Sequence, residues 1–292
     1  MKKILVTGAA GFLGSHLAER LAEMKHKVIG VDNMIGGYAD NVPKNIKFYN
    51  FDCCDLKKMK KLMNGVDVVY HCAATAHEGL SVFSPYEITK NNYLASVSVF
   101  SAAISNKVKR IIFCSSMARY GSQKIPFHED QLPEPVDPYG ISKVAAFHIT
   151  KYFRQAHELF AVNGILFNHE SPRRGETFVT RKISLGASRI KLGVEECIKI
   201  GNLDAKRDWG YAPEYVEGMR RILQQDKPDD YILATGEAHS VRDFVEEAAR
   251  LLDFDLAWKG KGLEETGVDR KTNKTIVRID PHFLRPTEVD EL

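Results

Sequence analysis

The sequence predicts an α/β fold: a doubly wound parallel sheet followed by a smaller α/β region. Two observations predict it. Short apolar runs alternate with amphipathic helical segments through the first half of the 292-residue chain, as in repeated strand–helix–strand units. A glycine-rich turn at residues 8–14 joins the first apolar run to the first of these helices. We therefore expect parallel strands with right-handed crossovers, and ligands bound at the carboxyl ends of the strands.

The composition is that of a globular chain, with 44% hydrophobic residues, 27% charged residues and a net charge of +3. A charge this small does not indicate a nucleic-acid partner. The apolar runs are too short for a membrane span, so we expect no membrane partner. The five cysteines lack metal-like spacing. This predicts no metal site and a reduced, cytoplasmic set of thiols.

The first strand, turn, helix and second strand carry the most specific motif. The turn contains Gly8, Gly11 and Gly14, and the second strand ends at Asp32. Glycines let backbone N–H groups approach a pyrophosphate at a helix N-terminus, and a strand-end carboxylate can accept both ribose hydroxyls. Because Asp32 would repel a 2′-phosphate, the motif favours NAD over NADP. A simpler role for Asp32 and Asn33 is to form the turn after the strand.

A second motif lies further along the chain, where Tyr139 and Lys143 are four positions apart. Pro138 should open a helix, which places the pair one turn apart on the same face. An ammonium near a phenol lowers the pKa of the phenol, which would make Tyr139 a proton acceptor near neutral pH. Taken alone, the pair is more typical of a solvated helix face. The glycine turn, Asp32 and a strand end at Ser116 favour an active site instead.

These motifs together resemble the extended short-chain dehydrogenase/reductase superfamily, in its sugar-nucleotide epimerase/dehydratase branch. The resemblance covers residues 1 to about 145 and includes Ser116 ahead of Tyr120-Gly121. It implies a Rossmann-type domain that holds NAD, with Tyr139 as base, Lys143 on the nicotinamide ribose and Ser116 on the sugar hydroxyl. The same resemblance implies further cofactor contacts at Phe12, Leu13, Asn33, Asp52, Cys53, Cys72, Ala73, Ala74 and Asn92, and a substrate contact at Ser81. Asn92 also matches a position that supports the catalytic helix.

From about residue 150 the chain resembles one subfamily, the GDP-mannose 4,6-dehydratases. The resemblance lies in four runs, at residues 161–182, 201–210, 234–242 and 285–290. It implies a GDP-sugar substrate held by Asn168, Thr180, Lys182, Arg207, Arg285 and Glu288. Arginine and lysine suit a diphosphate, and a carboxylate suits ribose or guanine donors.

The chain departs from those dehydratases in three places. It has Ala118 where they carry a glutamate that serves as base and acid, and Asp32-Asn33 where they have an arginine-rich strand end. It also stops at Leu292 where they continue. The first half therefore resembles NAD-dependent 4-epimerases and the second half the dehydratases, with a join between about residues 143 and 155. This suggests a natural or engineered chimera, which could also be truncated.

The predicted function is transient oxidation of a GDP-mannose-type sugar at C4, with NAD as the oxidant. In a 4,6-dehydratase, loss of water would follow. In a 4-epimerase, hydride would return to the other face of the sugar. Ala118 cannot move a proton, and His77 or Glu78 could replace the missing glutamate. A UDP-sugar epimerase and a catalytically weak NAD-binding chimera or scaffold are the remaining alternatives.

Two domains are expected: an NAD-binding domain at residues 1–165, and a mainly GDP-sugar-binding region at 166–292 with some segments returning to the first sheet. Related enzymes pair two helices from each subunit in a four-helix interface. The segments 91–106 and 139–160 would supply these helices in a homodimer or a tetramer. Leu94 is expected on the inward face of the first helix, and Phe100 and Phe147 could lie at the interface rather than in the core.

Overall fold

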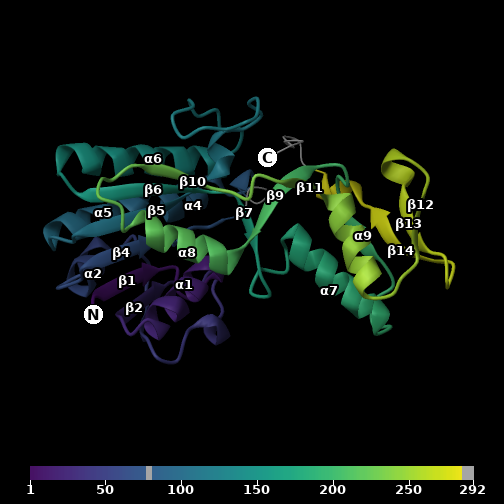
Figure 1. The fold of residues 1–292 in the computed structure, drawn as a ribbon, viewed down its shortest axis with the longest axis horizontal. Coiled ribbons are helices and arrows are strands. Elements are labelled where there is room, and N and C mark those ends of the chain that lie inside the picture. The colour runs from purple at the N-terminus through teal and green to yellow at the C-terminus, as the bar shows by residue number, and fades with distance from the viewer. Residues whose placement is uncertain (77–80, 285–292) are drawn as a thin grey trace. The chain divides into compact units, whose positions relative to one another are not determined.

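The computed structural model describes residues 1–76 and 81–284, and Figure 1 shows its helices and strands. Two compact units are present. The first contains residues Met1–His169 and Gly210–Ala234, and the second contains Glu170–Trp209 and the chain from Thr235 onward. The chain thus leaves the first unit and returns to it for one short segment. Among the described residues, no helix is long and apolar enough to cross a membrane.

The first unit is built on a seven-stranded sheet with strand order β10-β6-β5-β4-β1-β2-β3. All its neighbouring strands are parallel. The strands are β1 (Lys3–Thr7), β2 (Lys27–Asp32), β3 (Lys47–Asn50), β4 (Val68–His71), β5 (Arg110–Ser116), β6 (Phe160–Leu166) and β10 (Asp230–Leu233). The order changes direction at β1 and β4, which is where doubly wound sheets bind ligands. The predicted parallel sheet is confirmed.

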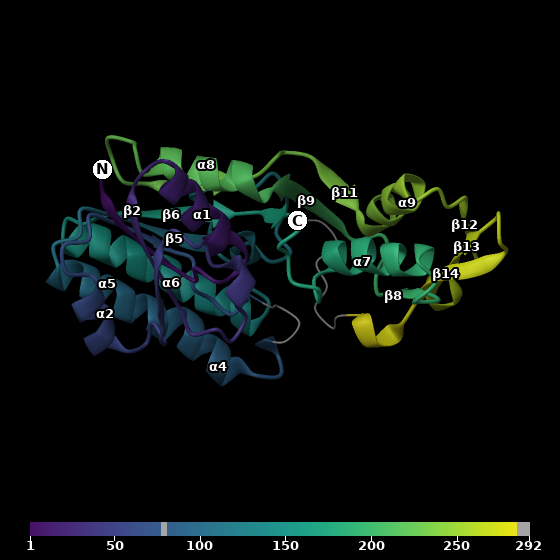
Figure 2. The same ribbon diagram turned by 90° about the horizontal axis from the view of Figure 1, so that it is seen from below.

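Helices cover both faces of this sheet, as Figure 2 shows. One face carries α1 (Phe12–Glu23) and α8 (Ala212–Ile222), and the other carries α2 (Leu56–Leu62), α5 (Ala95–Ser105) and α6 (Pro138–Ala156). Successive strand residues point to opposite faces. In β1, Ile4 and Val6 therefore join the core beneath α1, whereas Leu5 joins the core beneath α5. Both faces are apolar, as buried parallel strands require.

The helix expected over residues 91–106 has a different form. The chain runs from α4 (Pro85–Thr89) through a π-helical turn, η2 (Lys90–Leu94), into α5. The wider turn changes the helical phase, and Leu94 is 51% exposed, so its predicted inward position is wrong. The suggested interface positions of Phe100 and Phe147 are also wrong. Both rings are buried, and Phe100 stacks on Phe153 of α6 inside the core.

The second unit has its own sheet, with strand order β12-β13-β14-β8, and its own core. The strands are β8 (Ile198–Ile200), β12 (Leu256–Lys259), β13 (Thr266–Asp269) and β14 (Lys274–Ile279), and the helices are α7 (Val179–Lys191) and α9 (Val241–Leu251). Apolar residues of α7, α9, β8 and β14 form the core. The remaining elements are strands β7 (Asn168–Glu170), β9 (Lys206–Tyr211) and β11 (Ala238–Ser240), and short helical turns η1 (Ala39–Asn41), η3 (Met117–Arg119), η4 (Gly262–Glu264) and η5 (Pro281–Phe283).

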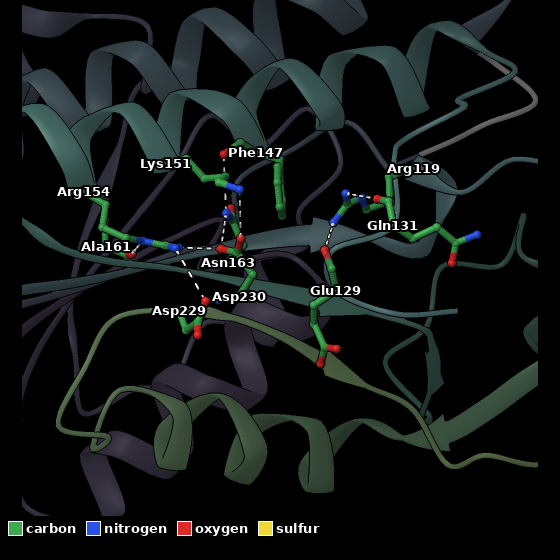
Figure 3. A network of polar contacts seen from close by, with 10 residues as sticks. All are labelled: Arg119, Glu129, Gln131, Phe147, Lys151, Arg154, Ala161, Asn163, Asp229 and Asp230. Carbon is green, nitrogen blue, oxygen red and sulfur yellow. Dashed lines mark hydrogen bonds and ion pairs between the residues drawn. The ribbon is translucent and has the colours of Figure 1, made fainter. Parts of the chain in front are cut away.

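A network of charged and polar side chains holds the second half of α6 against the sheet (Figure 3). Arg154 of α6 donates to the Asp230 carboxylate of β10 at 2.5 Å and to the Ala161 carbonyl of β6 at 2.7 Å. Asn163 of β6 donates to the same carboxylate at 2.8 Å, and the Lys151 ammonium lies 3.9 Å from it. Because the Arg154 and Asp230 side chains are both largely buried, their pairing fixes α6 to two strands at once.

Replacing Arg154 by leucine should destabilise the first unit. The substitution leaves the Asp230 carboxylate buried with its strongest partner removed, which typically costs about 3 kcal/mol of unfolding free energy. Chemical denaturation followed by circular dichroism would measure the change. Fluorescence would not, because both tryptophans, Trp209 and Trp258, lie in the second unit.

Arg250→Leu is the matched control. Arg250 pairs with Glu247 one helical turn away, but both side chains are exposed, and exposed pairs contribute little to stability. Its midpoint of unfolding should stay close to that of the parent protein. Equal losses in the two variants would contradict a special role for the Arg154 network.

Candidate active site

The carboxyl ends of neighbouring strands bring several predicted site residues to one edge of the sheet. Thr7 ends β1 and lies in register with His71, which ends β4. Asp32 ends β2, and Ser116 ends β5. All four residues are buried. Polar side chains that are buried at the ends of parallel strands are typical of a ligand site in a doubly wound sheet.

The glycine turn wraps tightly between β1 and α1. Gly8 has φ +72°, and a Cβ there would lie 2.8 Å from the backbone nitrogen of Ala73. A Cβ on Gly14 would collide with the Gly8 carbonyl, to which Gly11 donates a hydrogen bond at 3.0 Å. Gly11 caps α1 without a side-chain hydrogen bond, and the first turn of α1 carries no acidic residue. The backbone N–H groups at this helix end therefore suit an anion such as a pyrophosphate.

The Asp32 carboxylate is fixed above this turn. It accepts hydrogen bonds from the backbone N–H groups of Ala10 at 3.1 Å and Met34 at 2.8 Å, one on each oxygen. Each oxygen keeps further capacity to accept a hydroxyl proton. Asn33 accepts a hydrogen bond from the N–H of Ile35, so both residues also form the turn after the strand. The chain from Asn33 to Pro43 has no lysine or arginine, which suits a ribose without a 2′-phosphate.

Helix α6 begins at Pro138, as predicted, and the Asp137 side chain caps it by accepting from the N–H of Gly140 at 2.7 Å. Tyr139 is 8% exposed and Lys143 is 4% exposed. The simpler interpretation of the pair as a solvated helix face is therefore wrong. The Lys143 ammonium lies 5.7 Å from the centre of the Tyr139 ring. A buried positive charge at this distance acts on the phenol through a medium of low dielectric constant.

Lys143 is held by the strand below it. Its ammonium donates to the carbonyl oxygen of Cys114 at 2.8 Å and lies 4.9 Å from the centre of the Phe113 ring. Burial lowers the pKa of Lys143 to about 8, because the charged form loses its hydration. Lys143 is thus mainly protonated at neutral pH but loses its proton far more readily than an exposed lysine.

A chain of buried hydrogen bonds connects the strand ends with the helices beside α6. Ser96 Oγ donates to the Asn92 carbonyl at 2.6 Å, so it must accept from His71 Nε2–H, 2.9 Å away. His71 Nδ1 then accepts from Thr7 Oγ1 at 2.8 Å, and Thr7 Oγ1 accepts from the N–H of Ala73. Burial lowers the pKa of His71 to about 3, so the imidazole is neutral and each polar atom in the chain has a partner.

Asn92 connects this series of hydrogen bonds to α6. Its Nδ2 donates to Ser142 Oγ at 2.9 Å, and its Oδ1 accepts from the N–H of Thr75 at 2.8 Å. Ser142 lies on α6 between Tyr139 and Lys143. The support of the catalytic helix by Asn92 stays a prediction, and this contact favours it. His71 and Ser96 were not among the predicted site residues. The only signal for His71 was a polar residue at the end of an apolar strand.

The other predicted cofactor residues lie around the same edge. Asp52 accepts from the N–H of Cys54 at 2.8 Å, and Cys53 is buried. Phe12 opens α1 and its ring stacks on that of His169. Leu13 is buried, whereas Cys72, Ala73 and Ala74 are partly exposed where the chain leaves β4. The structure thus places these positions on the strand ends and turns of the first unit.

The predicted substrate residues fall in both units. In the first, Ser81 is fully buried, and Asn168 Nδ2 is buried without a hydrogen-bond partner among the described residues. In the second, Thr180 donates to Glu170 at 2.6 Å, the Lys182 ammonium lies over the Phe283 ring, and Arg207 donates to the Lys206 carbonyl. Arg285 and Glu288, together with His77 and Glu78, lie outside the described residues.

Comparison with known proteins decides the family. The family model described as GDP-mannose 4,6 dehydratase matches residues 5–292. The chain belongs to the GDP-mannose 4,6-dehydratase family. The GDP-mannose 4,6 dehydratase of Homo sapiens is 40% identical over 308 residues, covering 99% of this chain and 82% of that protein. The GDP-mannose 4,6-dehydratase of Sinorhizobium fredii is 38% identical and covers 100% of this chain and 88% of that protein. One family model therefore spans both sides of the suggested join.

Solved structures of sugar-nucleotide enzymes share the fold. The UDP-N-acetylglucosamine 4-epimerase of Methanobrevibacter ruminantium has a TM-score of 0.84 at 26% identity, covering 99% of this chain and 88% of that chain. The dTDP-glucose 4,6-dehydratase DesIV of Streptomyces venezuelae has the same TM-score at 20% identity, covering 99% and 87%. The second likeness shows the fold alone. Both neighbours agree with the Rossmann-type fold, and the first also agrees with an enzyme of the epimerase/dehydratase type.

Position 118 is one of the three places where the sequence is expected to depart from the dehydratases. Ser116 Oγ accepts from the N–H of Ala118 at 3.2 Å, which leaves its own proton available to a ligand. The Ala118 side chain packs with Ile88 and Tyr139 in a small buried apolar cluster. A Cβ on Gly140 would lie 2.9 Å from the Ala118 carbonyl, so η3 and the start of α6 are in close contact. The position is thus apolar and closely packed beside Tyr139.

Replacing Gly8 by alanine should disrupt the turn. The new Cβ would meet backbone atoms of Ala73, which cannot rotate away as a side chain can. We expect a loss of stability beyond the cost of a positive φ for alanine, which is about 1–2 kcal/mol. NAD binding, measured by calorimetry, should fall at least tenfold, because the turn and the residues after β4 must both move.

Gly65→Ala is the matched control in the same unit. Gly65 has φ +69°, but a Cβ there would meet only the end of the Lys3 side chain at 3.8 Å. It should lose stability through its backbone conformation and keep its NAD affinity. Similar NAD affinities for Gly8→Ala and Gly65→Ala would contradict the close approach at Gly8.

Proposed function

We propose that this protein oxidises C4 of a GDP-mannose-type nucleotide sugar with NAD, as in the GDP-mannose 4,6-dehydratases. The observation that carries the proposal is the buried Tyr139–Lys143 pair, with the Lys143 ammonium fixed by the Cys114 carbonyl. A nearby positive charge favours the phenolate, which is the form in which a tyrosine serves as a base. Burial strengthens the effect of that charge, because the surrounding dielectric constant is low. Family membership supports the substrate class.

The residues present fit NAD. The Gly8–Gly14 turn and the N-terminus of α1 would hold the pyrophosphate, and Asp32 would accept from the adenosine ribose. Further contacts would come from Phe12, Leu13, Asn33, Asp52, Cys53, Cys72, Ala73, Ala74, Asn92, Tyr139 and Lys143. Bound NAD supplies the acceptor for the hydride of C4. The lack of basic residues after Asp32 supports NAD rather than NADP.

The side chains divide the proton chemistry between them. The Tyr139 phenolate takes the proton of the C4 hydroxyl. Ser116 Oγ, which accepts from the N–H of Ala118, donates its own proton to orient that hydroxyl. The Lys143 ammonium stabilises the phenolate, which lowers the pKa of Tyr139 toward the working pH. Each role needs only residues that the first unit itself carries.

A second outcome, 4-epimerisation, is favoured by position 118. Dehydration needs a base for the proton on C5. The dehydratases resembled here use a glutamate at this position, where the present chain has Ala118 packed against Ile88. Epimerisation needs only the return of hydride to C4. The C4 oxidation is common to both outcomes, and the step after it distinguishes them.

We assign the substrate nucleotide mainly to residues 166–292 and NAD to residues 1–165. The positions resembling GDP-sugar contacts are Ser81, Asn168, Thr180, Lys182, Arg207, Arg285 and Glu288. Burial lowers the pKa of Lys182, and a lysine ammonium is a common ligand for phosphate. The Nδ2 of Asn168, which is buried and has no hydrogen-bond partner in the described part of the chain, also suits a bound ligand.

We also propose a cytoplasmic homodimer assembled through residues 91–106 and 139–160. Leu94, Ile141 and Tyr152 in these segments are apolar or aromatic and exposed, and exposed side chains of this kind are common at interfaces between subunits. The five free cysteines support a reducing compartment.

The deciding experiment is incubation with GDP-mannose and NAD, followed by the mass of the product. Loss of water identifies a dehydratase, and an isomer of unchanged mass identifies an epimerase. The Tyr139→Phe variant keeps the ring but removes the phenol, so turnover should fall by at least about a thousandfold. Retained turnover in this variant would refute the assigned base.

Failure of the parent protein to bind GDP-mannose would refute the substrate assignment. If it binds NAD and turns over neither GDP-, UDP- nor dTDP-sugars, the protein is a cofactor-binding scaffold instead. If it epimerises UDP-sugars and not GDP-mannose, it is a UDP-sugar epimerase.

The activity should decline as pH rises through about 8, the pKa of Lys143. Above this pH the amine becomes neutral and no longer stabilises the Tyr139 phenolate. The unfolding free energy should change in the opposite direction. Unfolded Lys143 keeps its proton up to its ordinary pKa of 10.5, so the unfolded state binds more protons in this window and the folded state gains stability as pH rises. A pH profile of kcat/KM that is flat through this range would contradict the role of Lys143.

A further inference from the structure

Two thiols lie together at the carboxyl edge of the first sheet. The Sγ atoms of Cys72 and Cys114 are 3.4 Å apart, and Cys114 donates its S–H to Cys72. β4 and β5 pair in parallel with His71 opposite Phe113. Cys72 directly follows His71, and Cys114 directly follows Phe113, so the two cysteines are neighbours across the sheet. None of the roles proposed above uses their sulfur chemistry.

This placement meets the geometric needs of a disulfide. Adjacent strands lie about 4.8 Å apart, within the range of about 4.4–6.8 Å between the Cα atoms of bonded cysteines. The sulfur atoms would need to approach by about 1.4 Å to reach the bond length of about 2.05 Å. Small rotations of the two side chains can supply this movement without separating the strands.

We propose that Cys72 and Cys114 form a redox-active dithiol, which a peroxide converts to an intramolecular disulfide. The other three cysteines are placed differently. Cys54 donates its S–H to the Lys90 carbonyl, and Cys197, in the second unit, lies 3.5 Å from the Ile198 carbonyl. Cys53 is buried next to Cys54 in the sequence.

The oxidation proceeds in two balanced steps. The Cys72 thiolate attacks one oxygen of the peroxide, so that an S–O bond forms, the O–O bond breaks and hydroxide leaves as water after taking a proton. Cys114 then attacks the sulfenic sulfur of Cys72. An S–S bond forms, the S–O bond breaks, and the hydroxide leaves as a second water with the proton of Cys114. Cys72 reacts first because it is partly exposed, whereas Cys114 is buried.

The surroundings set the rate of this reaction. The neighbouring Cys114 thiol and burial raise the pKa of Cys72, whereas the Lys143 ammonium acts to lower it. The net effect is upward, so the thiol form dominates at neutral pH and the reaction with peroxide becomes faster as pH rises. The disulfide would form beside the Cys114 carbonyl that holds Lys143. If the proposed role of Lys143 is right, oxidation should also slow turnover until a dithiol restores it.

Counting free thiols tests the proposal without relying on activity. The full chain is treated with hydrogen peroxide at about pH 8.5, where more of the thiol is ionised, and its thiols are counted with DTNB in denaturant. The count should fall from five to three, and dithiothreitol should restore it. Peptide mapping of the oxidised parent protein should find the Cys72–Cys114 link, with the loss of two hydrogen atoms.

Cys72→Ser should keep all four remaining thiols under the same treatment, because the residue that reacts first is gone. Cys114→Ser should lose at most one, since Cys72 can form a sulfenic acid but has no partner thiol beside it. A parent count that stays at five would overturn the proposal. So would a loss of two thiols in either variant, or a disulfide mapped to another pair or between two chains. If the untreated parent protein turns over no sugar nucleotide, the proposed function is wrong, but the expected thiol count is unchanged.

Discussion

The burial of the Lys143 ammonium is the constraint on which the rest of the site depends. A charge at this depth is costly unless it is hydrogen-bonded, and the structure gives it the Cys114 carbonyl at 2.8 Å together with two aromatic rings. A carbonyl stabilises the ammonium less than a carboxylate would, so the pKa of Lys143 stays at about 8 and its charge can change close to neutral pH. Among residues 1–76 and 81–284, no carboxylate is paired with this charge, so it can act on the Tyr139 phenol. This balance holds only while α6 stays fixed against β5.

Two independent networks fix that helix. At its far end, Arg154 connects α6 to β6 and β10 through Asp230 and the Ala161 carbonyl. Near its N-terminus, Ser142 Oγ accepts a hydrogen bond from the side-chain amide of Asn92, which lies in the π-helical turn before α5. The carbonyl of the same Asn92 continues through Ser96 and His71 to Thr7 at the end of β1. The strand that leads into the glycine turn and the helix that carries Tyr139 are thus joined by one satisfied set of buried hydrogen bonds, which favours a single geometry.

Local patterns were sufficient to predict the parallel sheet, the glycine turn and the start of α6 at Pro138, because each depends on residues close in sequence. The exposed position of Leu94 could not be predicted from periodicity. The π-helical turn has more residues per turn than an α-helix, so it rotates the residues that follow to another face, and the sequence does not reveal where such a turn occurs. The buried chain through His71 and Ser96 needs partners 25 to 64 positions apart, and a single sequence gives no indication of such pairs. The burial of Phe100 and Phe147 likewise depends on how α5 and α6 pack. The assigned roles of the site residues stay predictions, and the contacts of Lys143 and Asn92 favour them.

Membership of the dehydratase family does not by itself determine the reaction, because the two possible outcomes differ in one proton transfer. The residues proposed to serve C4 oxidation, Ser116, Tyr139 and Lys143, are all buried and lie on β5 and α6 of the first unit. Position 118 lies in η3, directly after β5, and there the Ala118 side chain packs with Ile88 and Tyr139. A carboxylate in that small apolar cluster would lose its hydration, which is costly. It would also lie beside the Tyr139 phenolate, and two negative charges at short range raise each other's pKa. The present packing avoids that repulsion. Alanine at this position thus supplies no base for C5, and it also places no carboxylate beside Tyr139 that would raise the pKa of the phenol.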